Sequence, residues 1–379
     1  MNVQFETIFV HTAATDSDIS QRFQHAFPEA RVVPVQAESE VRKWLKGPDT
    51  KVVYIGPRSS PFVSRFRPPG GMICASFWKF TSETFCPLGC HYCYLSLTLR
   101  IIPYVRVASN LDKGLGEVES VLVQQARQEG QPRVMFNIGE LADGRVLDPV
   151  THLSRYLLPI LDQHPTGMLH VLTKAGSDTI GNYLDLAHLA QGRIIHVASI
   201  NPQLVIDSTE EGTAPLLDRL AALQRLQQAG YRIRLRIDPI LDLRDFGYSE
   251  EVAYGVYDEL VDQIGDYCRP ELITLGSYRP HPQLICHIRR RYPDSLVLKA
   301  STYKNGKKRR LEGRQAFYQR VVEQVWAGSP WVRIALCKET LDVWKDVGLD
   351  PKPLQCSCLP CYGEHSKWSE GSEVRNECA

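Results

Sequence analysis

The sequence has almost no net charge, since 44 Lys and Arg residues face 43 Asp and Glu residues and leave a formal charge of +1. An overall positive field for attracting nucleic acid is therefore excluded, although a local basic patch can still contact phosphates. No uncharged apolar run reaches the 18 residues that a membrane-spanning helix needs, so we expect no membrane partner. The first residues lack a basic segment followed by an apolar stretch, so we expect no secretory signal peptide.

Cysteine, in contrast, is abundant. The chain has 11 cysteines, an odd number, and two groups of them are tightly spaced, at 86, 90 and 93 and at 356, 358 and 361. Together with the expected lack of a signal peptide, this usage indicates a cytoplasmic protein whose thiols stay reduced. Clustered cysteines in that compartment are metal ligands or redox groups more often than disulfides.

The first part of the chain predicts a small unit. With 379 residues, the chain has room for one large domain with appendages. Residues 1–70 predict an α/β unit, with strand-like and helix-like stretches at Phe5–His11, Ile19–Phe27, Glu40–Leu45 and Lys51–Ile55. The stretch Gly56–Gly71 holds four Pro and three Arg, which favours a linker or pinned connection.

Residues 71–285 alternate between apolar strands and amphipathic helices, which is typical of a parallel sheet with helices outside. The expected strands are Met72–Phe77, Val134–Ile138, Met168–Thr173, Ile194–Ile200, Tyr231–Ile237 and Leu272–Leu275. Pro215–Ala229 is a clear helix that Gly230 closes. Six strands suit a partial (β/α)6 TIM-like barrel as well as an open sheet, and periodicity alone does not separate the two. Residues 286–379 form a C-terminal extension.

Three cysteines with C-x3-C-x2-C spacing lie in one short loop, Cys86-Pro87-Leu88-Gly89-Cys90-His91-Tyr92-Cys93. A loop this tight can direct three sulfurs at one iron–sulfur cubane, which normally takes four ligands. The missing fourth ligand leaves one iron open, so we expect a reactive [4Fe–4S] cluster. The alternative is a zinc site that borrows His91 or a distant cysteine.

The extended motif resembles the radical S-adenosylmethionine superfamily, and within it the spore photoproduct lyase family. The resemblance covers residues 72–345 and, weakly, the N-terminal unit. The matching segments are Cys86–Leu95 with Thr98, Ile102–Val107, Leu172–Lys174, Ala198–Asn201, Glu211–Pro215 with Arg219, Ala229–Tyr231 and Asp238–Ile240. The resemblance implies the partial barrel, with its active site at the carboxyl ends of the strands.

The resemblance also implies the cofactor and its contacts. S-adenosylmethionine would chelate the open iron, Lys174 would pair with its carboxylate, and Ser199 would be a second polar contact. Gly139 and Glu140 would hold its amine, and Asp238 belongs to the same expected set. From the residues alone, Lys174 is equally well a surface charge and Glu140 a solvated loop acid.

Two tyrosines flank the last cysteine of the loop. By resemblance, Tyr92 and Tyr94 return hydrogen at the end of a radical cycle, and otherwise they are packing that excludes water from the cluster. The chain departs from the family in one respect. Lyases that split the thymine photoproduct carry a hydrogen-donor cysteine after the second strand, but no cysteine occurs here between 93 and 268. A paralogue with its own substrate is therefore expected.

Two further features lie in the C-terminal extension. Cys356, Cys358 and Cys361, with Cys337, predict a second iron–sulfur cluster, a structural zinc site or a redox pair, and otherwise are reduced thiols. Basic runs occur at Arg289–Arg291 and at Lys307, Lys308, Arg309 and Arg310. These runs are phosphate contacts or, as most charge runs are, a solvated face.

The leading hypothesis is a radical enzyme, lyase-like, that acts on a nucleic-acid lesion or a nucleotide-like substrate, with DNA or nucleotide as a partner. A reducing partner such as flavodoxin or ferredoxin would supply electrons. A second hypothesis keeps the radical chemistry but moves it to a small metabolite or peptide, because the donor cysteine is missing. The third is a non-catalytic binding protein that zinc stabilises.

Overall fold

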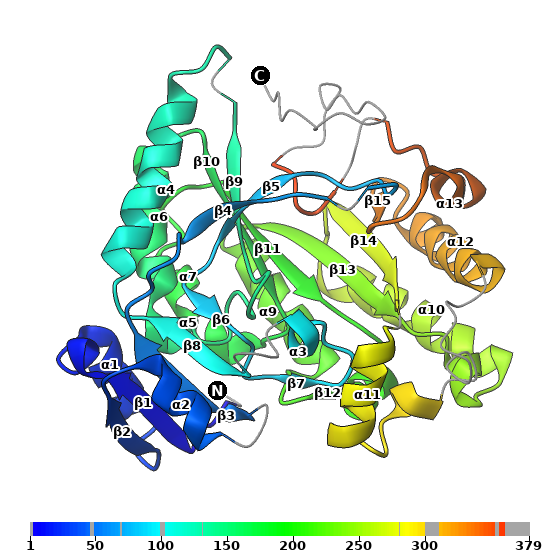
Figure 1. The fold of residues 1–379 in the computed structure, drawn as a ribbon. Coiled ribbons are helices and arrows are strands. Elements are labelled where there is room, and N and C mark those ends of the chain that lie inside the picture. The colour runs from blue at the N-terminus through cyan, green and yellow to red at the C-terminus, as the bar shows by residue number, and fades with distance from the viewer. Residues whose placement is uncertain are drawn as a thin grey trace.

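The protein is built on two sheets that meet beside a cysteine loop (Figure 1). The larger is eight-stranded in the order β15-β14-β13-β11-β10-β9-β5-β4, and the smaller is five-stranded in the order β2-β1-β3-β8-β6. The computed structural model describes residues 3–45, 49–68, 70–98, 103–130, 132–279, 281–299, 311–352 and 356–360.

The larger sheet is parallel except at one edge, where β4 runs antiparallel to β5. Its strands are β4 (Val63–Phe66), β5 (Phe77–Phe80), β9 (Val134–Ile138), β10 (Gly167–Thr173), β11 (Ile194–Ser199), β13 (Arg232–Ile240), β14 (Leu272–Ser277) and β15 (Arg333–Leu336). Within the described residues β15 and β4 do not pair, so the barrel stays open. The predicted α/β fold with a partial barrel is confirmed, and it gains two edge strands that the sequence pattern does not show.

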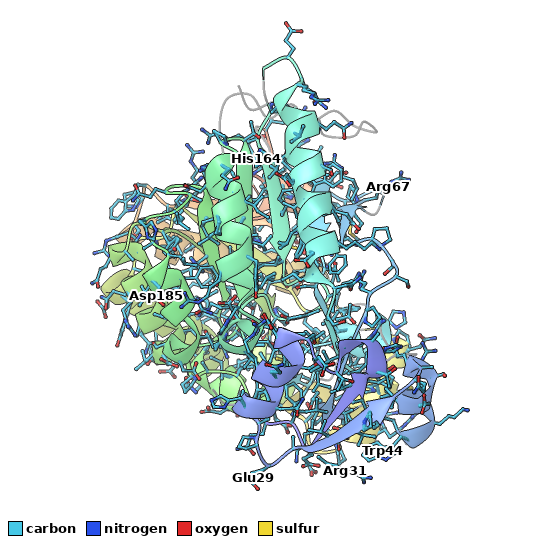
Figure 2. All side chains as sticks on the ribbon, turned by 90° about the vertical axis from the view of Figure 1, so that its left-hand side faces the viewer. Glu29, Arg31, Trp44, Arg67, His164 and Asp185 are labelled. Carbon is cyan, nitrogen blue, oxygen red and sulfur yellow. The ribbon has the colours of Figure 1, made fainter. Side chains whose placement is uncertain are left out.

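Helices cover the outer face of this sheet, because their apolar stripes match its apolar outer residues. Leu169 and Val171 of β10 lie in the main core cluster with helix residues such as Leu220, whereas Met168 packs with Met135 in a separate interior cluster. The helices of this part of the chain are α4 (Leu111–Ala126), α5 (Asp148–Thr151), α6 (Leu153–Gln163), α7 (Gly181–Asp185), α8 (Gln203–Thr209), α9 (Leu216–Gln228), α10 (Glu250–Tyr267), α11 (Pro282–Arg291), α12 (Leu311–Gly328) and α13 (Leu341–Asp346), of which α4, α6 and α9 pack directly on strands of the large sheet. Figure 2 shows α4 and α6 side by side on one outer face.

The smaller sheet begins with three parallel strands from the N-terminal unit. Two later strands then extend it, which ties the unit to the rest of the chain. Its elements are β1 (Thr7–His11), α1 (Asp18–Ala26), β2 (Arg31–Val35), α2 (Glu38–Trp44), β3 (Asp49–Gly56), β6 (Glu83–Thr84) and β8 (Tyr104–Ala108). Figure 2 shows the labelled Glu29, Arg31 and Trp44 at the far end of this unit.

One strand prediction is wrong. Met72–Phe77 was expected to be the first barrel strand, but the paired strand β5 begins only at Phe77. Gly71 has a φ of +75°, which turns the chain, and β9 offers partners only to Trp78 and Lys79. A strand needs a hydrogen-bonded neighbour, so the apolar run before Phe77 forms a single bridge, from Ile73 to Glu339.

Across the described ranges, no helix combines the length and apolarity that crossing a membrane requires.

Candidate active site

A pocket of about 520 Å³ opens at the carboxyl ends of the parallel strands. Each of several strands delivers one polar residue to its wall. The predicted site residues that line it are Cys86, Cys90, Tyr92, Cys93, Tyr94, Gly139, Glu140, Lys174, Ser199, Asp238 and Cys337. The fold thus brings together residues from 86 to 337 in one place, as parallel strands with aligned ends allow.

The cysteine loop is held against the barrel by a two-stranded ribbon of β7 (Gly89–Cys90) and β12 (Glu210–Glu211), followed by the short helix α3 (Leu95–Thr98). A Cβ on Gly89 would lie 3.0 Å from Cβ of Glu211, so glycine permits the close approach of the two strands. The three thiols are free and partly exposed. They therefore face the pocket from one short, pinned segment.

His91 fastens the loop from its other side. Its Nδ1 lies 2.8 Å from Oγ of Ser295, its Nε2 lies 3.3 Å from Oε1 of Glu211, and its ring stacks on Tyr292 at 4.0 Å between centroids. Burial lowers the pKa of His91, although Glu211 acts in the opposite direction. Since both ring nitrogens have protein partners, His91 holds the cysteine loop in position.

The floor of the pocket is a charged network around Glu210, whose side chain is fully buried. Lys174 Nζ donates to Glu210 Oε1 at 2.9 Å and to Ser199 Oγ at 3.0 Å, and Arg219 Nη2 donates to Glu210 Oε2 at 2.7 Å. The hydroxyl of Tyr92 also donates to Glu210. Burial alone would raise the pKa of Glu210, but the two cations hold it well below its ordinary value.

Asp143 fixes the position of Lys174. Its carboxylate accepts the backbone N–H of Lys174 at 2.7 Å and the hydroxyl of Thr173 at 2.7 Å. Gly139, with a φ of +103°, makes the neighbouring turn, and a Cβ there would lie 2.7 Å from the carbonyl oxygen of Leu172. The ends of β9 and β10 are therefore set by specific contacts.

The opposite wall carries a second ion pair. Arg236 Nη2 donates to Asp238 Oδ2 at 2.7 Å and lies 3.2 Å from Sγ of Cys337. Burial would raise the pKa of Asp238, but Arg236 and Arg279 lower it overall. A Cβ on Gly276 would lie 2.5 Å from Cγ of Asp238, so only glycine leaves room for this carboxylate. Tyr94, nearer to solvent, donates its hydroxyl to the carbonyl of Arg279.

Some residues in this site were not singled out from the sequence, notably Glu210, Arg236 and Asp143. Glu210 directly precedes the matched segment Glu211–Pro215, which is the one sequence signal that could have marked it. Cys356 and Cys358 line a small adjoining pocket with Cys74, which is too distant in sequence for cysteine spacing to group it with them. Cys361 and the run Lys307–Arg310 lie outside the described residues.

The donor set at the loop suits a cluster. Across the described residues, no three His, Cys, Asp or Glu side chains are grouped to hold a single metal ion. A cubane spreads its terminal ligands over separate corners, a requirement that three thiols around one pocket can meet.

An open α/β barrel with a C-x3-C-x2-C loop at its strand ends has the architecture of the radical S-adenosylmethionine superfamily. Within that class, the chain belongs to the spore photoproduct lyase family, whose family model matches residues 74–324. Two curated relatives are named spore photoproduct lyase. The protein of Geobacillus sp. (strain Y412MC61) is 29% identical over 181 residues, 48% of this chain and 50% of that one.

The second relative, from Bacillus subtilis (strain 168), is 29% identical over 157 residues, 41% of this chain and 44% of that one. The matched part of the chain thus spans about half the length of these curated relatives, at most. A solved spore photoproduct lyase in complex with dinucleoside spore photoproduct has a TM-score of 0.73 at 20% identity. It covers 89% of this chain and 100% of that one.

A variant of spore photoproduct lyase with bound AdoMet and dinucleoside spore photoproduct gives a TM-score of 0.69 at 20% identity, over 88% of this chain and 99% of that one. At this level of identity the structural likeness concerns the fold.

Proposed function

We propose that the chain is a radical S-adenosylmethionine enzyme, lyase-like, that acts on a nucleic-acid lesion or a nucleotide-like substrate, as in DNA repair. The observation that carries the proposal is the convergence of three thiols from one loop on the pocket that Lys174 and Ser199 line. Three cysteine ligands on a [4Fe–4S] cluster leave one iron for a ligand that is not protein.

The residues that line the pocket have different proposed roles, either as ligands of the cluster or as contacts to S-adenosylmethionine. Cys86, Cys90 and Cys93 would hold the cluster, which when bound and reduced supplies the electron that splits S-adenosylmethionine into methionine and a 5′-deoxyadenosyl radical. Lys174, directly after β10, would donate to the methionine carboxylate, and Gly139 and Glu140 would hold the amine, since all three line the pocket.

Other residues would position or protect the cofactor. Glu140, Ser199 and Asp238 offer acceptors from three neighbouring strand ends around the same space. Tyr92 is buried with its hydroxyl on Glu210, so it excludes water from the cluster side, whereas Tyr94 stands 45% exposed near the entrance. We assign both tyrosines to hydrogen return because they flank the last cluster cysteine.

The proposed substrate class rests on the family and on charge. A related structure holds dinucleoside spore photoproduct. In this chain the cations Arg236, Arg279 and Lys338 line the pocket beside its apolar wall, which suits a base next to a phosphate. Residues 94–267 contain no cysteine, so the final hydrogen must come from another group, and we propose a lesion other than the spore photoproduct.

The test is anaerobic reconstitution with iron and sulfide, followed by dithionite in place of a flavodoxin or ferredoxin partner. Wild-type protein with S-adenosylmethionine should release 5′-deoxyadenosine, and Cys90→Ala should not. Cys286→Ala, on an exposed part of α11, is the matched control and should retain the activity. Release at the Cys90→Ala background level would contradict the proposal.

A second arm addresses the substrate. Oligonucleotides with defined thymine lesions should accelerate release of 5′-deoxyadenosine, and the lesion that is consumed identifies the reaction. If the enzyme cleaved S-adenosylmethionine but no lesion accelerated the cleavage, the result would favour a small metabolite or a peptide as the substrate.

A further inference from the structure

A short C-terminal segment, Cys356–Pro360, enters the interior of the open barrel. Arg234, buried on β13, donates from Nη1 to the carbonyl oxygens of Ser357 and Leu359, both at 2.7 Å. Ser357, Cys358 and Leu359 are all buried. The segment is therefore an internal part of the barrel, and Arg234, which also pairs with Glu271 at 2.7 Å, anchors two of its backbone carbonyls.

This anchoring gathers four cysteines from distant parts of the chain. Cys74, Cys337, Cys356 and Cys358 line one small pocket beneath the active-site pocket. Cys74 lies there because Ile73 donates its backbone N–H to the carbonyl oxygen of Glu339 at 2.8 Å, which joins the segment before β5 to the segment after β15. The four cysteines thus meet where these two segments adjoin, and none of them is in a disulfide.

Two buried hydroxyls face the same space without a protein partner. Oγ1 of Thr274 and Oγ of Ser357 accept and donate no hydrogen bond within the described residues, although the two residues are only 2% and 1% exposed. A buried hydroxyl without a partner is costly, on the order of 1–3 kcal/mol. Sulfide or thiolate sulfur of a bound group would give both hydroxyls an acceptor.

From these observations we propose that Cys74, Cys337, Cys356 and Cys358 bind a second iron–sulfur cluster. Four cysteines complete the ligand set that such a cluster takes. Across the part of the chain that the structure describes, no three His, Cys, Asp or Glu side chains are grouped to hold a single metal ion, so the experiment below measures zinc and sulfide as well as iron. Three of the four residues lie beyond the matched range 74–324, so the family match does not supply this site.

The second site shares a wall with the first. Glu140, Arg236, Cys337 and Lys338 line both pockets, and the guanidinium of Arg236 lies 3.2 Å from Sγ of Cys337. A cation beside a ligand thiolate stabilises its charge. The cluster would therefore sit next to the substrate pocket, with Cys337 as the ligand nearest to it.

The experiment counts metal and does not depend on the proposed reaction. A variant with Cys86, Cys90 and Cys93 all changed to Ala is purified and reconstituted without oxygen, and its iron, zinc, sulfide and visible absorption are measured. We expect it to retain about two to four iron atoms per chain with matching sulfide. Adding Cys74→Ala or Cys358→Ala to it should remove this iron, whereas adding Cys268→Ala, buried next to α10, should not.

Circular dichroism and size-exclusion elution of each variant show that it is folded. The inference is overturned if the loop variant is folded but holds no iron, or if it holds zinc without sulfide. It is also overturned if Cys74→Ala leaves the iron in place. Wild-type protein that fails to cleave S-adenosylmethionine would count against the proposed function alone, since the iron of the loop variant is measured separately.

Discussion

Nζ of Lys174 lies 2.9 Å from Oε1 of Glu210, and the glutamate side chain has no exposed surface. Arg219, equally buried, holds the other carboxylate oxygen at 2.7 Å. One buried carboxylate thus serves two cations, one structural and one facing the pocket. Since two cations share one carboxylate, this cluster has a net positive charge at the side that faces the pocket, where Lys174 would contact an anion.

Changing Lys174 to Met tests its role toward S-adenosylmethionine. The proposed function predicts that affinity for this compound falls about 10- to 100-fold, the effect of losing one charge-assisted hydrogen bond. Isothermal titration of the reconstituted protein measures it. Lys113→Met, on the exposed face of α4, is the control, and equal affinities in the two variants would exclude Lys174 as a contact.

Changing Arg219 to Leu should destabilise the fold by about 3–5 kcal/mol, because it removes one of the two cations that compensate a buried carboxylate. Urea unfolding measures the free energy. Arg225→Leu, exposed on the same helix α9, should change stability by less than about 0.5 kcal/mol. A loss for Arg219→Leu no larger than that of the control would show that the network contributes little.

The raised pKa of Glu83 predicts that the stability of the fold depends on pH. Burial, with help from Asp148, raises the pKa of Glu83 to about 8. The folded state therefore keeps a proton on Glu83 that the unfolded state releases near pH 4.5. The free energy of unfolding is thus undiminished by Glu83 at low pH, and it falls as the pH rises from 4.5 to about 8.

Glu83→Gln should remove that loss and be more stable than wild type at pH 8 by about 1–3 kcal/mol, after allowance for partial exposure. Thermal unfolding between pH 5 and 8 measures the difference. Glu129→Gln, at an exposed turn, should follow the wild-type profile. If the stability of Glu83→Gln and of wild type changed with pH in the same way, the pKa of Glu83 would not be raised by burial.

Gly139→Ala should disturb the pocket, since its Cβ would meet the carbonyl of Leu172 at 2.7 Å in a left-handed backbone conformation. We expect a loss of about 1–3 kcal/mol in stability and weaker binding of S-adenosylmethionine. Gly116→Ala, in α4 with no neighbour within 4 Å, should instead be neutral or stabilising by up to about 1 kcal/mol. Similar effects of the two substitutions would contradict the steric argument.

Much of the barrel follows from local pattern. Val134–Ile138 and Ile194–Ser199 are short apolar runs between polar turns, and both form the strands that these runs predict. Parallel strands covered on both faces must be apolar, so the signal is local and strong. β4 and β15 are short edge strands, and such strands leave little trace in hydrophobic periodicity.

The sequence by itself determined the alternation of strands and helices and the cysteine loop, because both depend on residues close together in the chain. The resemblance of its motifs to the family also marked Lys174 and Ser199. Only the tertiary structure decided that Glu210 lies under Lys174 and that Cys74 joins Cys337, Cys356 and Cys358. Those contacts join side chains from segments that are 36 residues apart for Lys174 and Glu210 and more than 250 apart for Cys74 and the other three cysteines, and no local pattern encodes such pairings.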